Sequence, residues 1–275
     1  MTISQRSIEI MGTRLAFLEA GAGWPVILLH AFPLSADMWR PQLESVPDGW
    51  RFIAPDLRGF GPSLVPPRGG NYMTETLTMD DYAADVLSLM DALELDDAVI
   101  GGLSMGGYVA FAMHRLAPSR FAGMVLADTR PQADSPQVLE GRVRLRAVLA
   151  KDGPAGVADQ MLPKLLGETT RRERPDIVRH TRALIESASR EAIDAAIGAL
   201  MTRPDSTPGL ESISCAALVI VGEQDEIAPL AEAEAMQRAI RRSTLSVVPG
   251  AGHLSSLERP DVFSRGLGDF LRAVL

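Results

Sequence analysis

A chain of 275 residues with 46% hydrophobic content is long enough to bury the core of one large domain, or of a core with an insertion. Its 27 basic and 35 acidic side chains give a net charge of −8, which offers no basic surface for nucleic acid and no polybasic anchor for an anionic membrane. Cys215 is the only cysteine, which excludes disulfide bonds within the chain and zinc sites built from cysteines.

The first residues of the chain bear on its location. Residues 1–6 lack the apolar segment of a secretion signal. No stretch reaches the roughly 18 consecutive apolar residues that a membrane span requires. We therefore expect a cytoplasmic protein with neither membrane nor nucleic-acid partners.

The first predicted elements are strands. Residues 7–11 and 13–19 alternate between apolar and polar side chains around Gly12, which predicts an antiparallel hairpin at the edge of a sheet. The continuous apolar run at 26–30 is typical of a strand that is covered on both faces in a parallel sheet. A helix is expected next, over residues 37–46.

The loop after the strand at 26–30 carries the first candidate site residue. Because α/β sheets bind their ligands at the carboxyl ends of central parallel strands, the backbone amide of Phe32 is a candidate donor to a substrate oxygen. Pro33 would stiffen this loop. His30 closes a buried strand, and we expect it to connect neighbouring loops by hydrogen bonds rather than to act as a base.

Another buried strand is predicted at 51–55. The loop that follows carries Asp56 and Arg58, which we expect to brace it through charge-assisted hydrogen bonds. Residues 64–73 are rich in proline and glycine, which favours a flexible loop. The apolar spacing over 79–93 predicts a helix.

The most specific pattern follows. An apolar strand at 98–103 runs into Gly102-Leu103-Ser104-Met105-Gly106, and a helical pattern continues from Tyr108. This is the G-x-S-x-G elbow in its strand, turn and helix context, which lifts a serine onto a sharp turn. Side chains at the two glycines would clash where strand and helix meet. The amide of Met105 would point to the serine oxygen at the positive end of the helix.

A buried strand at 121–127 completes a series of strand and helix alternations that predicts a parallel sheet with right-handed crossovers. The alternation then stops, and only helical segments are expected, at 137–151, 154–166, 175–188 and 190–202. A helical insertion at this point is typical of a lid over the strand ends. We therefore expect a core formed by 1–130 and 207–275, and a helical cap at 131–206.

The strand pattern resumes at 217–222 and again at 244–248, with a helix between them that ends near Ile240. A closing helix is predicted at 260–273. The fold class is therefore α/β: a mostly parallel, eight-stranded sheet with an N-terminal antiparallel hairpin and a helical insertion after the sixth strand.

Three residues that follow apolar strands could form a catalytic group. Ser104, Asp225 and His253 lie in loops that a parallel sheet gathers at one edge, in the order nucleophile, acid and histidine. His253 would take the proton of Ser104 and later return it to the leaving alcohol. We favour Asp225 as the acid, because the strand before it leads directly into its turn. Rival acids are Asp128, Glu223 and Glu226.

Together these residues resemble the α/β-hydrolase superfamily over about 7–130 and 210–273. Within it the chain looks like the small bacterial serine hydrolases, which include carboxylesterases, 3-oxoadipate enol-lactonases and haloperoxidase-like perhydrolases. The resemblance implies a catalytic triad, an oxyanion hole, and no metal or organic cofactor. The residues that it assigns are Ser104, Asp225 and His253 for the triad, and the amides of Phe32 and Met105 for the oxyanion hole.

The leading functional hypothesis is hydrolysis of a small carboxylic ester or lactone through an acyl-serine intermediate. An alternative is cleavage of a carbon-carbon bond in a diketone, or perhydrolysis, since Phe32-Pro33-Leu34-Ser35 resembles the perhydrolase oxyanion loop. A non-catalytic receptor for a small ligand is less favoured, because it would gain nothing from an intact triad. The sequence is compatible with a homo-oligomer but does not indicate one.

Overall fold

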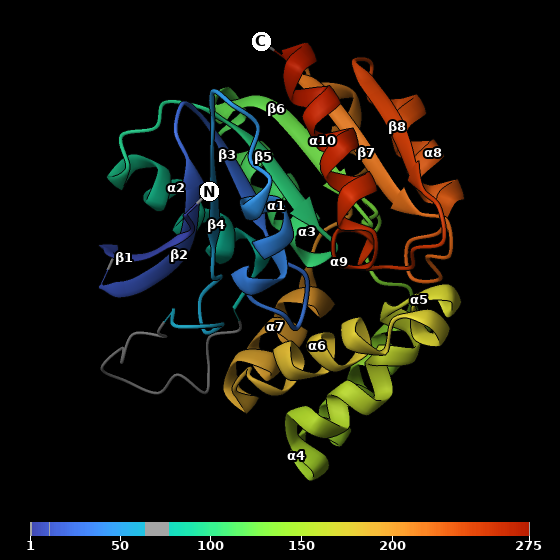
Figure 1. Cartoon of the computed structure of the whole chain (residues 1–275). Helices are drawn as coiled ribbons and strands as arrows, with labels where there is room; N and C mark the ends of the chain where they lie inside the picture. Colours follow the sequence, from blue (N-terminus) through green and yellow to red (C-terminus); the bar gives the residue numbers. More distant parts are fainter. Residues whose placement is uncertain (1, 11, 64–76, 275) are drawn as a thin grey trace.

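The computed structural model describes residues 2–10, 12–63 and 77–274 (Figure 1). In this part of the chain eight strands form one sheet, in the order β1-β2-β4-β3-β5-β6-β7-β8. The strands are β1 Ser4–Ile10, β2 Thr13–Gly21, β3 Trp24–Leu29, β4 Trp50–Pro55, β5 Ala98–Leu103, β6 Phe121–Ala127, β7 Ala216–Gly222 and β8 Ser243–Val248. The flexible loop expected at 64–73 lies outside the described residues.

Strand direction divides the sheet into two parts. β1 pairs antiparallel with β2, and β2 pairs antiparallel with β4. All the other neighbouring strands pair in parallel. The predicted mostly parallel sheet with an N-terminal antiparallel hairpin is thus confirmed. The central strand β5 is buried along its whole length, as its continuous apolar sequence indicates.

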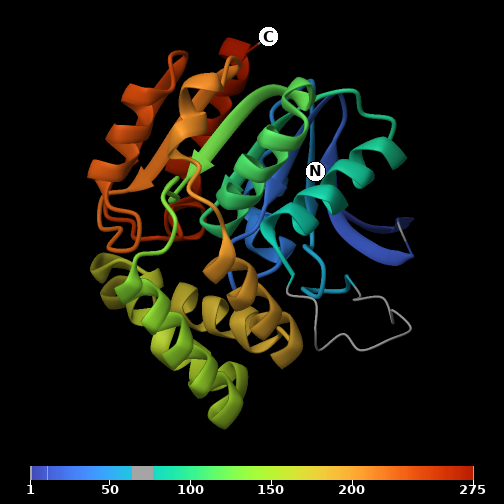
Figure 2. The same cartoon turned by 180° about the vertical axis from the view of Figure 1, so that it is seen from behind.

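Helices cover both faces of the sheet. α2 (Met79–Ala92) and α3 (Met105–Leu116) lie on one face, and α1 (Arg40–Glu44) and α10 (Pro260–Val274) lie on the other (Figures 1 and 2). α8 (Leu230–Ala239) packs against β7 and β8. Shorter helical segments are η1 Ala36–Trp39, η2 Pro118–Arg120, η3 Thr207–Ser212 and α9 Ser255–Glu258.

The helix expected at 37–46 is shorter and divided. A 3₁₀ turn, η1, leads directly into the five-residue helix α1. Pro41 stands in the first turn of α1 and has no N–H group to bond to a carbonyl one turn earlier, which favours a break in the helix at this point.

Helices α4 Pro136–Leu165, α5 Glu168–Glu173, α6 Pro175–Glu186 and α7 Arg190–Thr202 connect β6 to β7. They gather below the carboxyl ends of the strands (Figures 1 and 2). α4 is interrupted at Gly153, whose φ of 71° is not helical, between the two helices predicted there. The short helix α5 was not predicted, because its six residues, Glu-Thr-Thr-Arg-Arg-Glu, carry no apolar periodicity.

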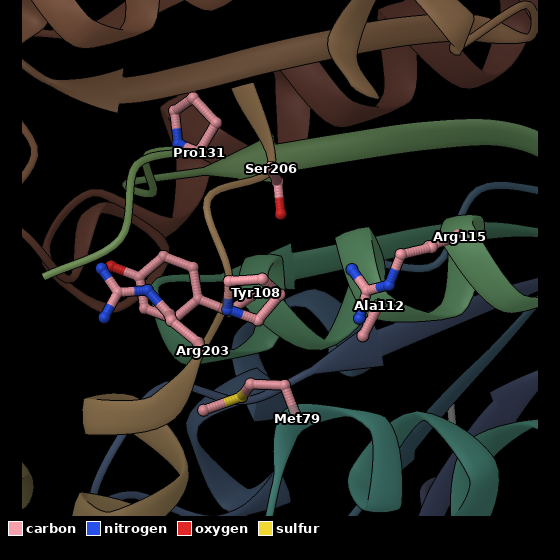
Figure 3. Close-up of a pocket in the computed structure, with 8 residues that line it drawn as sticks. Met79, Tyr108, Ala112, Arg115, Pro131, Arg203 and Ser206 are labelled. Atoms are coloured by element: carbon pink, nitrogen blue, oxygen red, sulfur yellow. The ribbon is translucent and has the colours of Figure 1, made fainter. Parts of the chain in front are cut away.

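The two chain segments that join these helices to the sheet lie side by side. The amide of Ser206 donates to the carbonyl of Pro131 at 2.8 Å. The buried guanidinium of Arg203 approaches the carboxylate of Asp134 to 2.6 Å and lies 4.1 Å from the centre of the Tyr108 ring (Figure 3). Arg203 thereby connects the end of α7 both to the segment before α4 and to α3 in the sheet layer.

Among the helices that the structure describes, none combines the length and the apolar character needed to cross a membrane.

Candidate active site

Ser104 stands on the turn between β5 and α3. Its φ of 54° and ψ of −112° lie in a region that residues with a side chain rarely adopt. A Cβ atom at Gly102 would lie 2.1 Å from the carbonyl of Gly106, and one at Gly106 would lie 2.2 Å from the carbonyl oxygen of Leu29. The predicted need for glycine at both positions is confirmed. The tight turn is what raises the serine above the end of β5.

His253 contacts Ser104 and Asp225 at the same time. Its Nε2 lies 2.8 Å from Ser104 Oγ, and its Nδ1 lies 2.8 Å from Asp225 Oδ2. Since a carboxylate only accepts, Nδ1 carries the proton, and Nε2 is left to accept the serine hydroxyl. Both His253 and Asp225 are buried, whereas Ser104 is partly exposed. The three residues singled out from the sequence therefore lie in one hydrogen-bonded series.

The carboxylate of Asp225 is held by its own turn. Its Oδ1 accepts the amides of Ile227 at 2.8 Å and Ala228 at 3.0 Å, while Oδ2 faces His253. These local bonds fix the orientation of the carboxylate, so that Oδ2 points to the imidazole.

The rival acids have other partners. Asp128 accepts the amide of Gly222 at 2.8 Å and the amide of Ser255 at 3.2 Å, so it joins the end of β7 to the start of α9. Burial and the charge of Asp225 raise the pKa of Asp128 well above its usual range. Glu223 accepts the amide of Gly250 at 2.9 Å, and Glu226 is exposed.

The backbone amides of Met105 and Phe32 are the expected oxyanion donors. Met105 is the first residue of α3, so its N–H has no acceptor within the helix. Phe32 is buried in the loop after β3. Within the part of the chain that the structure describes, neither N–H has a hydrogen-bond acceptor. Unpaired amides beside a serine can bind a developing negative charge.

His30 connects two loops, as expected. Its Nε2 accepts the amide of Leu57 at 3.0 Å, and its Nδ1 lies 3.0 Å from the carbonyl oxygen of Ala31. The ring of Phe60 meets it edge-on, with 5.1 Å between ring centres. Burial lowers the pKa of His30 to about 4, so the ring is neutral near pH 7.

The expected brace by Asp56 and Arg58 takes a different form. Asp56 accepts the amide of Ala36 at 2.8 Å, and so holds the end of the loop that contains Phe32. Arg58 turns away to α2, where its Nε donates to Asp85 at 2.8 Å. Burial raises the pKa of Asp56 to about 7. Both side chains stabilise the loop, but through partners distant in sequence.

Two supporting side chains were missed from the sequence. Thr129 donates its hydroxyl to the carbonyl oxygen of Ser104 at 2.9 Å. Glu258 accepts the amide of Gly252, next to His253, at 2.9 Å. Their partners are backbone groups, which every residue type carries, so no pattern of residue types in one sequence identifies them.

Comparisons with known proteins bear on the family and the fold. A family model described as the alpha/beta hydrolase fold matches residues 25–260. A thermophilic esterase from Thermogutta terrifontis, solved with malate bound, is 41% identical, with a TM-score of 0.91 over 98% of this chain and 99% of that one.

Two curated relatives carry different activities in their names. 3-Oxoadipate enol-lactonase 2 of Acinetobacter baylyi is 27% identical over 88% of this chain and 86% of its own length. A non-heme chloroperoxidase of Streptomyces lividans is 30% identical, with 95% of this chain and 97% of its own length covered. With the family model matching most of its length, the chain belongs to the α/β-hydrolase fold family.

Proposed function

We propose that this protein is a serine hydrolase that cleaves a small carboxylic ester or lactone, with Ser104 as nucleophile, His253 as general base and Asp225 as the acid that orients it. The observation that carries the proposal is the unbroken series of hydrogen bonds, 2.8 Å at each step, from Ser104 Oγ through the imidazole to Asp225. A serine hydroxyl needs such a base because it is a weak nucleophile at neutral pH. The esterase and enol-lactonase relatives support the substrate class.

In the first half of the reaction, Ser104 Oγ attacks the carbonyl carbon while its proton passes to His253 Nε2. The carbonyl oxygen becomes an anion that the amides of Phe32 and Met105 can bind. The bond from carbon to the alcohol oxygen then breaks, and His253 gives its proton to that oxygen. This leaves an acyl-serine and an alcohol, which in a lactone stays attached to the acyl group.

In the second half, water attacks the acyl-serine. His253 takes a proton from the water and returns it to Ser104 Oγ as the bond from carbon to serine breaks. The acid product leaves and Ser104 is restored. Asp225 keeps the imidazole in the tautomer that each step requires.

Residues 131–206 act as a cap in this proposal. Helices α4 to α7 lie below the carboxyl ends of the strands (Figure 1), and Ser104 directly follows one of these ends, that of β5. The amide of Gly167, between α4 and α5, donates to Glu258 at 2.8 Å, and the same carboxylate accepts the amide of Gly252, next to His253. A cap at this place would exclude water from the active site and line the acyl pocket.

The experiment is hydrolysis of p-nitrophenyl esters of graded chain length and of an enol-lactone by the wild type and by Ser104→Ala. We expect the variant to lose at least about 1,000-fold in kcat/KM and to keep its melting temperature. Ser212→Ala is the control, because this serine on η3 is exposed and its hydroxyl donates to the carbonyl of Gly209 in its own turn, at 2.6 Å. Ester hydrolysis that survives in Ser104→Ala would reject the assignment, as would failure of a fluorophosphonate to label the wild type at Ser104.

Perhydrolysis is the second candidate, favoured by the similarity to a non-heme chloroperoxidase. Here Ser104 would form the acyl-serine from a carboxylic acid with loss of water, and hydrogen peroxide would replace water as the attacking group to release a peracid. Peracid formation from acetate and peroxide, measured beside ester hydrolysis, separates the two activities.

A further inference from the structure

Glu258 is a buried carboxylate at the end of α9, and its three hydrogen bonds within the described part of the chain all come from backbone amides. The residue is only 1% exposed. Oε1 accepts the amides of Gly252 at 2.9 Å and Leu254 at 3.2 Å, and Oε2 accepts the amide of Gly167 at 2.8 Å. A charge in such a place is retained only if it is well hydrogen-bonded, because burial removes its hydration.

The first two of these amides flank His253. Since Gly252 precedes the histidine and Leu254 follows it, one carboxylate oxygen holds the backbone on both sides of the imidazole. Hydrogen bonds to a charged acceptor are stronger than those between neutral groups. The place of His253 Nε2, 2.8 Å from Ser104 Oγ, therefore depends on the side chain of Glu258.

The third amide belongs to the segment between α4 and α5. This segment is in close backbone contact with the histidine loop: a Cβ atom at Gly252 would lie 2.3 Å from the amide nitrogen of Gly167. The first turn of α5, directly after this segment, reaches the loop of Asp225, since Gln224 accepts the amide of Thr169 at 3.1 Å and donates to its hydroxyl at 2.8 Å. The segment at 167–169 thus contacts both loops that hold the imidazole and its acid.

We propose that Glu258 is a positioning residue that fixes His253 for proton transfer and at the same time ties the α4–α5 segment to the histidine loop. This segment is consequently a fixed part of the active site. Movement of the other cap helices leaves it in place, because separating it from the loop would leave a buried carboxylate oxygen without its donor. The inference rests on the proposed function for its catalytic part alone.

The test is Glu258→Gln. Glutamine has one acceptor oxygen and places an NH₂ group where the second carboxylate oxygen stood, so at least one backbone N–H faces another donor. Small errors in the position of a catalytic group are costly, and we expect kcat for p-nitrophenyl acetate to fall about 100-fold. KM should stay within about threefold, because the groups that bind substrate are untouched.

Glu223→Gln is the matched control. Glu223 accepts one amide of the same loop, that of Gly250, at 2.9 Å. One amide oxygen is enough for one donor, so kcat should stay within about twofold of the wild type. A kcat for Glu258→Gln as high as that of the control would overturn the proposal.

Amide hydrogen exchange provides a measurement that needs no catalysis, and its first comparison is made in the wild type alone. Because Gly167, Gly252 and Leu254 share one acceptor group, their amides should exchange slowly and at similar rates in the wild type. All three should exchange at least about tenfold faster in Glu258→Gln. A wild-type Gly167 amide that exchanges far faster than that of Gly252 would refute the link, even if the variant did not fold. Shared protection in a protein without esterase activity would instead reject the proposed function and support the link.

Discussion

Replacing His30 by glutamine should remove part of the loss of unfolding free energy that the wild type suffers at acidic pH. His30 lies at the start of the loop that contains Phe32. The neutral imidazole accepts the amide of Leu57 through Nε2. A proton on Nε2 would place two donors face to face, and burial opposes the charge as well. The pKa of His30 is lowered from 6.5 to about 4 for this buried ring. The unfolded chain therefore takes up a proton below pH 6.5 that the folded chain refuses until about pH 4.

The sign and size follow from this difference. A folded state that binds fewer protons than the unfolded state loses stability as pH falls. A lowering of about 2.5 pKa units corresponds to about 3 kcal/mol of unfolding free energy lost between pH 7 and pH 4. Glutamine can offer Oε1 to the Leu57 amide and does not titrate. His30→Gln should cost about 1 to 2 kcal/mol at pH 7, through lost packing. This deficit should vanish between about pH 6 and pH 5, and near pH 4 the variant should be the more stable protein by about 1 to 2 kcal/mol.

The assay is urea unfolding followed by tryptophan fluorescence at several pH values from 7 to 4. All other titrating groups are common to both proteins, so their contributions cancel in the difference between the two unfolding free energies. His180→Gln, at an exposed histidine of α6, controls for the loss of an imidazole. A difference between wild type and His30→Gln that stays constant from pH 7 to 4 would refute the reasoning.

Three further predictions concern stability. Burial raises the pKa of Asp56 from 3.8 to about 7, so the folded state keeps a proton that the unfolded state loses, and stability falls as pH rises from about 4 to about 7. In urea titrations Asp56→Asn should therefore gain up to about 4 kcal/mol on the wild type between pH 4 and pH 8, and parallel curves would count against this. Gly106→Ala should abolish soluble expression or lower the melting temperature sharply, because its Cβ would lie 2.2 Å from a β3 carbonyl oxygen. Gly209→Ala is the control: a Cβ at this position would have no atom within 4 Å, and its melting temperature should remain near that of the wild type. Arg203→Met should cost about 3 kcal/mol in denaturant unfolding, because it removes the nearest partner of the buried Asp134, and an unchanged midpoint would contradict that role.

The features that could be predicted from the sequence are those with a local signature. The strand β5 and the elbow at Ser104 show as an apolar run that ends in glycines, and the crowding at Gly102 comes from Gly106, four residues later. The crowding at Gly106 comes from Leu29 on β3, which only the fold brings there. The order of Ser104, Asp225 and His253 predicted that they would meet, since parallel strands place their following loops at one edge. Each of these inferences needed only neighbouring residues and the direction of the chain.

Other features could not be predicted, because their partners are remote or are backbone groups. From the sequence we expected Arg58 to brace its loop together with the nearby Asp56, yet in the fold its partner is Asp85 on α2. Asp128 and Asp225 both follow strands, and only the packed loops direct one of them to His253 and the other to Ser255. Chain order places such loops together, but it does not orient the side chains.

By itself the sequence therefore determined the fold class, the chain order of the candidate catalytic residues after their strands, and the glycine elbow. Hydrophobic periodicity and local steric crowding act over a few residues and so can be read from one sequence. Only the tertiary structure decided which acid faces the histidine and how Glu258 joins Gly252 to Gly167, 85 residues apart by number. The physical reason is that a buried carboxylate must find its donors wherever the packed backbone presents them, and backbone amides look the same at every position of a sequence.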